Sequence, residues 1–378
     1  MPTALCNGRV LVPAGLRDDV CVVIDGAHIR AVSSQPPADA HIVDLGGRLL
    51  LPGFVDIQVN GGGGRLFNDD PSVDTIAAIA AAHRRFGTTG LLPTLISDDL
   101  DVVERAIAAV DAAIEAGVPG VLGIHVEGPF LSPERHGIHL KSKLRALEDD
   151  FIALLAGAKH GRTLVTIAPE IVTPDQVARL IAAGVIVSAG HSDASYDQVR
   201  AAIDNGVTGF THLFNAMSQL RNRAPGMVGA ALEDDHVYCG IIVDGHHIHP
   251  ASLRVAIRAK GPERMMLVTD AMPSVGSDEA SFLLQGRAIT RSDDRLLDDQ
   301  GTLAGSTLSM ARAFANVIDQ GRVTERQASM MASATPAAFL GLGDQLGAIV
   351  AGLRADLVAL DADYAVSQSW IGGVCETP

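Results

Sequence analysis

The stretch VIVSAGHSDASYDQVRAAIDNGVTGFTH, Val185–His212, decides the fold. It opens on a short apolar run, Val185–Ala189, continues through a stretch with helical period, Tyr196–Asn205, and closes on a second apolar run, Val207–Thr211. Short apolar runs that alternate with helices are typical of buried parallel strands. The stretch therefore predicts one strand–helix–strand unit.

The same unit repeats through the middle of the chain. Eight apolar runs read as strands: Phe54–Gln58, Thr88–Leu95, Val121–Val126, Leu164–Ala168, Val185–Ala189, Val207–Thr211, Cys239–Val243 and Met265–Thr269. Helical stretches such as Val73–Phe86 and Val102–Ala116 lie between them, and we expect helix starts at Asp70 and Thr173, each just before a proline. Eight units predict a closed (β/α)8 barrel of roughly 250 residues. A dinucleotide-binding open sheet is disfavoured because no GxGxxG follows an early strand.

The two ends of the chain differ from the middle. Short segments rich in Val and Ile, separated by turns, occur at Gly8–Val12, Val20–Asp25, Ile29–Val32, Ile42–Leu51, Ala348–Val350 and Asp356–Leu360. Such segments predict a small β module to which both ends contribute. The predicted fold class is α/β: a TIM-like barrel over residues 52–341 and an accessory β-sandwich domain built from residues 1–51 and 342–378.

Composition narrows the function classes. The chain has 378 residues and a net charge of −15, without the clustered Lys and Arg that nucleic-acid binding needs. It shows neither a signal peptide nor an apolar run long enough to span a membrane. Four widely spaced cysteines without a CxxC pair indicate reduced thiols and a cytoplasmic protein.

Polar residues end four of the predicted strands. They are Glu127, His191, His212 and Asp270, after the third, fifth, sixth and eighth strands. Catalytic groups of a barrel lie at the carboxyl ends of its strands. We therefore expect these four side chains to converge on one face.

Each of the four also has an ordinary structural explanation. A single His after a strand is often hydrogen-bonded within the core, and a single Glu or Asp can cap the next helix. As a set, a carboxylate and two imidazoles form a ligand set of catalytic Zn²⁺, with one position open for water. Such an ion lowers the pKa of water to roughly 7, and Asp270 can accept the proton as the water attacks a carbonyl carbon. His139 is a candidate donor to the resulting oxyanion.

Four consecutive glycines, Gly61–Gly64, follow the first predicted strand. They indicate either a mobile loop with unusual backbone angles or backbone N–H groups that approach a ligand. The sequence leaves both interpretations open.

The order of motifs resembles the N-acetylglucosamine-6-phosphate deacetylase family of the amidohydrolase superfamily. The resemblance covers nearly the whole chain, from Leu51–Asp56 to Ala355–Val358. The motifs that carry it are His125–Phe130 (HVEGPF), Gly190–Ser192, Thr211–Met217 (THLFNAM), Asp244–His247, Leu267–Ala271 and Leu303–Ser306.

The resemblance implies removal of acetate from N-acetyl-D-glucosamine 6-phosphate. It implies Glu127, His191 and His212 as metal ligands and Asp270 as the acid–base. The substrate contacts that it implies are Ile138 and His139 near the scissile amide, Asn215, Ala216, Arg223 and His247 on the sugar phosphate, and a loop of Leu303, Ala304 and Gly305. It also implies a homodimer in which the neighbouring subunit completes the phosphate site.

One departure from the wider superfamily concerns the number of metal ions. Many members carry His-x-His after the first barrel strand and bind two ions, whereas this chain has Gln58 and Asn60 there. Amides are poor ligands for Zn²⁺ beside imidazoles. We expect one divalent ion, with Zn²⁺ favoured by ligand type and Fe²⁺ or another ion left open.

Three other functions compete with this one. A deacetylase of the galactosamine epimer would differ only at one sugar hydroxyl. A binuclear cyclic amidase, such as a dihydroorotase or hydantoinase, is disfavoured by the missing His-x-His and by the absence of a lysine after the fourth strand, where Ala168-Pro169-Glu170 stands. A non-catalytic interaction protein on the same fold is disfavoured because the single-metal ligand set is intact.

Overall fold

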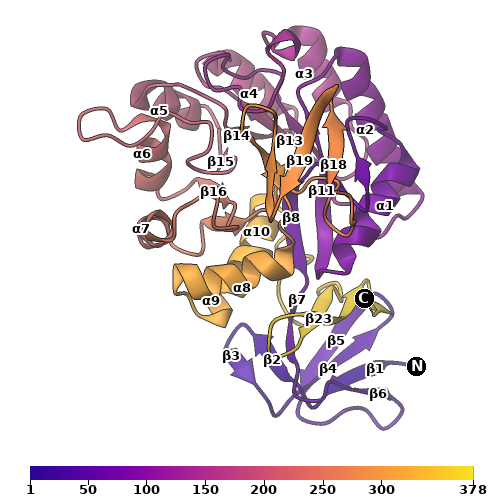
Figure 1. Ribbon diagram of the computed structural model, residues 1–378. Helices are drawn as coiled ribbons and strands as arrows, with labels where there is room; N and C mark the ends of the chain where they lie inside the picture. The colour runs from indigo at the N-terminus through magenta and orange to yellow at the C-terminus, as the bar shows by residue number, and fades with distance from the viewer. Residues whose placement is uncertain (378) are drawn as a thin grey trace.

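Eight parallel strands form the centre of the molecule, in the order β17-β16-β15-β14-β13-β12-β11-β8 (Figure 1). The computed structural model describes residues 1–377. The barrel strands are β8 (Phe54–Val59), β11 (Thr88–Ile96), β12 (Gly123–Glu127), β13 (Arg162–Ile167), β14 (Ile186–Ala189), β15 (Gly209–Phe210), β16 (Tyr238–Ile241) and β17 (Met265–Leu267). Each overlaps one apolar run of the sequence, so the prediction of eight barrel strands is confirmed.

Backbone contacts beyond the ends of β8 and β17 bring the first and last strands together. The N–H of Asp270 donates to the carbonyl of Gln58 (3.0 Å), and the N–H of Asn60 donates to the carbonyl of Ala271 (2.9 Å). The first strand therefore delivers Gln58 and Asn60 beside Asp270 of the eighth.

Helices cover the outside of the barrel (Figure 1). They are α1 (Val73–Arg84), α2 (Leu100–Glu115), α3 (Asp149–Ala156), α4 (Pro174–Ala182), α5 (Tyr196–Asp204), α6 (Gly226–Glu233), α7 (Pro250–Lys260), α8 (Met310–Gly321), α9 (Glu325–Ser329) and α10 (Thr335–Phe339), with a short turn η1 (Lys141–Lys143) and a π-helical turn η2 (Met330–Ala334). No helix of residues 1–377 is both long and apolar enough to cross a membrane.

Two expected helix starts had different outcomes. Thr173 caps α4 through a reciprocal capping box with Gln176, as expected. Asp70 was the wrong choice for α1: the cap is Ser72, whose hydroxyl accepts the N–H of Thr75. Asp70 lies too far upstream to take that N–H, and its carboxylate instead accepts the hydroxyls of Ser72 and Thr75.

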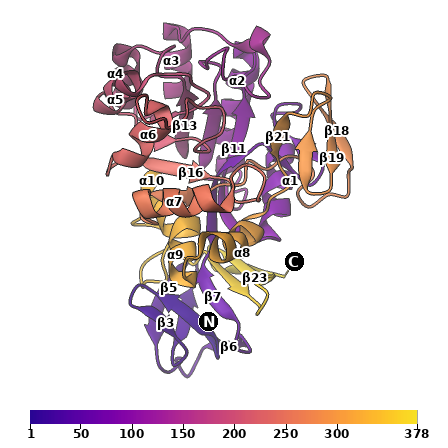
Figure 2. The same cartoon turned by 60° about the vertical axis from the view of Figure 1, so that its left-hand side comes forward.

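Both chain ends build an accessory β-sandwich below the barrel (Figures 1 and 2). One sheet has the order β5 (His28–Ser33), β4 (Cys21–Asp25), β1 (Thr3–Cys6), β6 (His41–Asp44); the other has β24 (Val374–Glu376), β23 (Val366–Ile371), β22 (Leu357–Leu360), β7 (Leu49–Pro52), β2 (Arg9–Val12), β3 (Gly15–Arg17). Antiparallel pairing of β7 with β22 joins the two ends. Leu5, Leu50 and Trp370 belong to the apolar cluster of this module.

Two strand predictions in the accessory module were wrong in detail. The run Ile42–Leu51 is divided, because Gly46 and Gly47 take positive φ angles and turn the chain between β6 and β7. Ala348–Val350 forms no strand; Ile349 is buried in the accessory core without joining a sheet.

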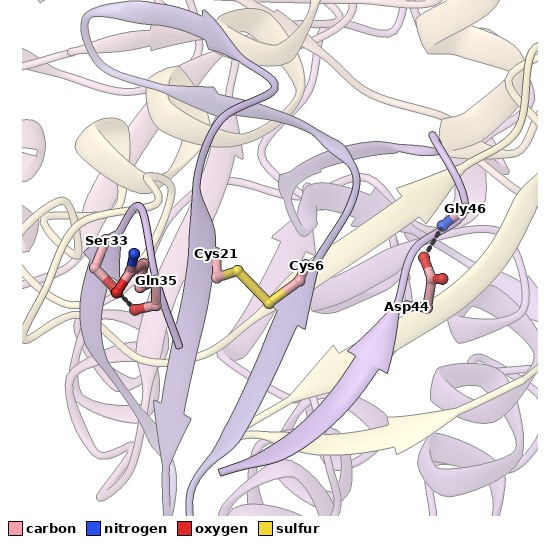
Figure 3. Close-up of a disulfide and its surroundings, with 6 residues drawn as sticks. All are labelled: Cys6, Cys21, Ser33, Gln35, Asp44 and Gly46. Carbon is pink, nitrogen blue, oxygen red and sulfur yellow. Dashed lines mark hydrogen bonds between the residues drawn. A yellow bond between two sulfur atoms is a disulfide. The ribbon is translucent and has the colours of Figure 1, made fainter. Parts of the chain in front are cut away.

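The expectation that all four cysteines are reduced is corrected by the structure. Cys6 and Cys21 lie opposite each other on the antiparallel strands β1 and β4, with their Cα atoms 4.4 Å apart, and form a disulfide (Figure 3). The two cysteines are 15 positions apart in sequence, and spacing alone did not indicate the pair. Cys239 and Cys375 are not disulfide-bonded.

A small antiparallel sheet projects from one side of the barrel (Figure 2). Its strands are β18 (Ser281–Leu284), β19 (Arg287–Ser292), β20 (Arg295–Leu297) and β21 (Leu303–Ser306). Leu284, Ile289 and Leu296 pack in one apolar cluster with Ile96 and Ile138. The sequence did not predict this sheet.

The glycine run forms a tight hairpin, β9 (Gly61–Gly62) with β10 (Arg65–Leu66). Gly63 and Gly64 have positive φ angles, as the first interpretation expected. The N–H groups of Gly61, Gly63 and Gly64 donate to backbone carbonyls within the protein, so these three are not available to a ligand. The alternative interpretation, in which the glycine N–H groups approach a ligand, is therefore wrong for these three residues.

Candidate active site

A cavity of about 500 Å³ opens at the carboxyl ends of the barrel strands. It collects most of the residues predicted from the sequence: Glu127, Ile138, His139, His191, His212, Asn215, Ala216, His247, Asp270, Leu303 and Gly305. Two predicted contacts lie elsewhere. Ala304 is buried in the apolar cluster under the small sheet, and Arg223 lines a separate cavity of about 640 Å³.

Unusual backbone angles orient three of the side chains that line the cavity. His191, His212 and Asp270 have φ angles of 46°, 34° and 51°, in the left-handed region that residues other than glycine rarely adopt. Each follows a barrel strand, so the chain turns sharply where the strand ends. Strain of this kind persists where the surrounding structure fixes it, commonly at functional sites.

Three buried atoms form a compact triangle in the cavity. Glu127 Oε1 lies 3.1 Å from His191 Nε2 and 3.0 Å from His212 Nε2, and the two nitrogens are 3.0 Å apart. His139 also lies close, with ligand atoms of Glu127, His139 and His191 within 4.8 Å of one another. One carboxylate and several imidazoles therefore face the same small volume.

The hydrogen bond between His191 and the backbone of Arg135 indicates whether a cation fits between the three atoms of the triangle. Its Nδ1 lies 2.9 Å from the carbonyl of Arg135, which can only accept, so Nδ1 carries the proton of the neutral ring. Nε2 then presents a lone pair to the carboxylate of Glu127, and two acceptors at 3.1 Å repel each other. A divalent cation held between them satisfies both, so the residues fit a metal ion.

Two amide side chains of the first strand hold the carboxylates. Asn60 Nδ2 donates to Asp270 Oδ1 at 2.6 Å. Gln58 Nε2 lies 3.1 Å from Glu127 Oε2 and 3.3 Å from Asp270 Oδ1, which links the two acids. From sequence these amides were recognised only as poor metal ligands; their position at a strand end was the signal for this second role.

The surroundings of Asp270 change the pKa of its carboxyl group. Burial, together with the negative charge of Glu127, raises the pKa of Asp270 to about 6. A carboxylate with a pKa in this range is ionised at neutral pH and still accepts a proton readily, which suits a general base. The arrangement thus supports the role predicted for Asp270.

A fully buried carboxylate, Asp56, supports the strand that carries Asp270. It accepts the hydroxyl of Thr269 at 2.5 Å and the N–H groups of Thr269 and Gln58 at 3.3 and 3.2 Å. Burial raises its pKa to about 7. Asp56 was not singled out in the sequence, although it lies two residues before Gln58.

The histidines after β16 have three different partners. His247, which lines the cavity, lies with Nδ1 2.6 Å from Asp244 Oδ2. His246 Nε2 lies 2.7 Å from Asp294, and His249 caps α7 by accepting the N–H of Ala251. Although burial acts to raise it, the pKa of Asp244 is lowered by the hydrogen bond from His247.

His139 is almost fully buried, with 1% of its surface exposed. Burial, and the charge of His191 beside it, hold the pKa of His139 well below its usual range. Its Nδ1 accepts the backbone N–H of Ser97. Ser97 is a neighbour of the site that the sequence did not indicate.

Sequence comparison connects the chain to a protein family and to curated relatives. The model of the amidohydrolase family matches residues 49–375. An N-acetylgalactosamine-6-phosphate deacetylase of Shewanella sp. (strain ANA-3) is 46% identical over 371 residues, which are 97% of this chain and 94% of the relative. An N-acetylglucosamine-6-phosphate deacetylase of Haemophilus influenzae is 34% identical over 378 residues, covering 99% of each chain.

Structural comparison agrees with the sequence. One of the matching structures is the N-acetyl-D-glucosamine-6-phosphate deacetylase of Mycobacterium smegmatis, solved as an Asp-to-Ala variant in complex with N-acetyl-D-glucosamine-6-phosphate. The two folds superpose with a TM-score of 0.92 at 34% identity, over 99% of each chain. The likeness therefore extends over the barrel and the accessory module together.

Proposed function

We propose that this chain, which belongs to the amidohydrolase family, hydrolyses N-acetyl-D-glucosamine 6-phosphate to D-glucosamine 6-phosphate and acetate. The observation that carries the proposal is the triangle of Glu127, His191 and His212 in one cavity with the carboxylate of Asp270. Relatives that cover nearly the whole chain act on amino-sugar 6-phosphates by name.

Glu127, His191 and His212 would hold one divalent ion. When bound, such an ion lowers the pKa of a water molecule toward roughly 7 and polarises a carbonyl group. We propose Zn²⁺ because of the ligand types. A second ion lacks ligands on the first strand, since the amides of Gln58 and Asn60 are engaged with Asp270 and Glu127; metal analysis of the purified protein decides between Zn²⁺ and Fe²⁺.

Asp270 moves the proton. Its Oδ1 is held by Asn60, which leaves Oδ2 to take a proton from the attacking water. The same proton then passes to the amide nitrogen as the carbon–nitrogen bond breaks, so acetate and a free amine leave. His139 donates a hydrogen bond to the carbonyl oxygen and stabilises the negative charge that develops there.

A phosphomonoester needs charge-assisted donors, which are scarce in a chain with a net charge of −15. We propose that His247, supported by Asp244, and the Asn215–Ala216 turn contact the sugar phosphate. Leu303 and Gly305 line the same cavity and would contact the sugar. Arg223 lines a different cavity of its own chain, and we propose that it reaches the partner's substrate in a homodimer.

The galactosamine epimer is the second candidate substrate. It is favoured by one observation, the 46% identity to the Shewanella relative that is named for it. The two substrates differ only in the configuration at C4, so the metal centre and Asp270 serve both equally well.

A deacetylation assay tests these proposals with three substrates: the two epimeric N-acetylhexosamine 6-phosphates and unphosphorylated N-acetylglucosamine. We expect the glucosamine phosphate to have the highest kcat/KM. A higher value for the galactosamine phosphate would make the second candidate the correct one. Equal turnover of the unphosphorylated sugar would contradict the phosphate roles of His247 and Arg223.

We also propose that the protein works in the cytoplasm. Its substrate is an anion, and charged groups cross a bilayer at a high energetic cost, so the enzyme and the reactions that phosphorylate the sugar share one compartment. Cytoplasmic thiols are kept reduced. The Cys6–Cys21 disulfide would be an exception to this rule, and alkylation of cell lysates followed by mass spectrometry measures the fraction of the pair that is oxidised in cells.

A further inference from the structure

We propose that Ser97 is a positioning residue that holds His139 as the Nε2–H tautomer, which makes His139 a hydrogen-bond donor and excludes it from the metal ligands. The donor role of His139 toward a substrate rests on the proposed function, whereas its tautomer does not. His139 needs such an assignment because its ring atoms lie as close to Glu127 and His191 as a ligand's would.

The backbone of Ser97 fixes the tautomer. Ser97 follows β11, and its N–H donates to His139 Nδ1 at 3.2 Å; its hydroxyl lies 2.8 Å from the same nitrogen. A backbone N–H can only donate, so Nδ1 must present a lone pair. The single N–H of the neutral ring then lies on Nε2. A ring whose Nε2 carries hydrogen has no lone pair there for a metal ion.

His191 has the opposite arrangement. Its Nδ1 faces the carbonyl of Arg135 at 2.9 Å, and a carbonyl can only accept, so its lone pair is on Nε2. The rings of His139 and His191 contact each other edge to face, with centroids 4.4 Å apart. Two neighbouring histidines are thus given different functions by one backbone N–H and one backbone carbonyl.

Two amide side chains hold the peptide of Ser97 in place. Asn68 accepts the N–H of Ile96 at 3.0 Å and donates to the carbonyl of the same residue at 3.1 Å. Gln285, in the turn between β18 and β19, donates to the carbonyl of Ser97 at 2.9 Å. The small sheet beside the barrel therefore helps to orient the N–H that His139 accepts.

Close packing keeps water away from this hydrogen bond. Ser97 and His139 each expose 1% of their surface. A Cβ atom at Gly128 would lie 2.3 Å from the hydroxyl of Ser97, so only glycine fits between Glu127 and the Ser97 side chain. With no solvent to replace the Ser97 N–H, the ring has little freedom to change tautomer.

Nuclear magnetic resonance of the zinc-loaded wild-type protein tests the tautomers directly. The protein is labelled with ¹⁵N in its histidine rings, and long-range ¹H–¹⁵N spectra distinguish a protonated ring nitrogen from one with a lone pair. The spectrum of His139→Gln assigns the His139 signals by their loss. We expect hydrogen on Nε2 of His139 and on Nδ1 of His191; hydrogen on Nδ1 of His139, or a metal ion on its Nε2, would overturn the proposal.

Two pairs of variants give independent readouts. A Gln side chain places its amide N–H near the position of Nε2–H, whereas Asn is too short. We expect both His139→Gln and His139→Asn to keep one metal ion per chain, and His139→Gln to keep at least about tenfold more kcat, since loss of one oxyanion donor costs roughly 10²–10³ in rate. Loss of the metal ion in both variants would show that His139 is a ligand.

Ser97→Ala keeps the backbone N–H and Ser97→Pro removes it. We expect the His139 spectrum to be unchanged in Ser97→Ala, and to show both tautomers in Ser97→Pro together with a lower kcat at unchanged metal content. An unchanged tautomer in folded Ser97→Pro would contradict the proposal; if that variant does not fold, the wild-type spectrum still decides. A wild-type protein with the expected tautomers but no deacetylase activity would refute the proposed function alone.

Discussion

Asp270 is the residue on which the proposed chemistry depends most directly. It combines a strained backbone angle, a short hydrogen bond from Asn60 and a raised pKa. Asp270→Asn keeps the shape of the side chain but cannot take a proton. We expect kcat to fall by roughly 10²–10⁴, the usual contribution of a general acid–base group, with the metal content unchanged. Near-normal turnover of a fully metal-loaded variant would remove Asp270 from its role.

The environment of Asp270 also predicts a pH dependence. The base must be ionised, so kcat/KM should fall as the pH drops through the pKa of about 6. The hydrogen bond from Asn60 lowers that pKa. Asn60→Ala removes it, so the pKa rises further and the acidic limb of the pH profile moves to higher pH. The measurement is kcat/KM between pH 5 and 8 for both proteins, and a limb displaced to lower pH would contradict the prediction.

At the residue scale, the sequence identified those candidate site residues that lie at the carboxyl ends of barrel strands. Polar residues at the ends of buried parallel strands marked Glu127, His191, His212 and Asp270, because in a barrel those ends share one face. Ser97 acts on His139, 42 residues further along the chain, through its backbone N–H. Side-chain chemistry does not reveal such a contact, and the path of both loops is needed to find it.

The contact between the first and last barrel strands, β8 and β17, should stabilise the fold to an extent that depends on pH. Asp56 joins the two strands from a fully buried position, with a pKa of about 7, against an unfolded value of about 3.9. A carboxyl group with a raised folded pKa binds its proton more tightly in the folded state. Its contribution is therefore full below the unfolded pKa and is lost as the pH rises from about 4 to about 7, by at most about 4 kcal/mol.

Asp56→Asn removes this titration and keeps an oxygen that can accept the N–H groups. We expect the free energy of unfolding of the variant to change less than that of the wild type between pH 4 and pH 7. Urea denaturation of both proteins at several pH values measures the difference. Identical pH dependence of the two proteins would show that Asp56 does not titrate in this range.

The disulfide between β1 and β4 should stabilise the accessory module without affecting turnover. Closing a loop of 15 residues stabilises a fold by about 3 kcal/mol in the chain-entropy view. We expect a reducing agent to lower the melting temperature of the oxidised wild-type protein. The matched control is Cys6→Ala/Cys21→Ala, which should melt at the same temperature with and without reductant. A reductant effect of equal size in the control would assign it to other groups.

At the element scale, the sequence predicted buried strands better than exposed ones. Nearly every residue of the eight barrel strands is buried on either face, and most of these residues are apolar, so each strand is recognisable as a largely apolar run. The strands β18 to β20 alternate exposed Ser, Arg and Thr with few buried residues, and their apolar side chains become recognisable only beside Ile96 and Ile138. The division of Ile42–Leu51 likewise depends on two backbone angles that composition does not specify.

At the scale of the whole molecule, two cavities share one residue. Arg135 lines both the active-site cavity and the cavity that contains Arg223. Its guanidinium group is paired with Asp193, and its carbonyl orients His191. The sequence led us to expect Arg223 on the substrate phosphate, but whether an arginine serves its own site or a partner's depends on assembly, which a single chain does not specify.

Complementation between two inactive variants tests the proposed homodimer. Asp270→Asn lacks the base but offers an intact Arg223 to its partner, and Arg223→Ala retains the base. If Arg223 acts across the interface, a mixed dimer has one complete site, and random pairing restores about a quarter of wild-type activity. Co-expression with two affinity tags isolates the mixed dimer, and each variant purified alone is the control. If Arg223 serves its own chain, every site in the mixed dimer lacks one of the two groups, and the activity will not exceed that of the two variants measured separately.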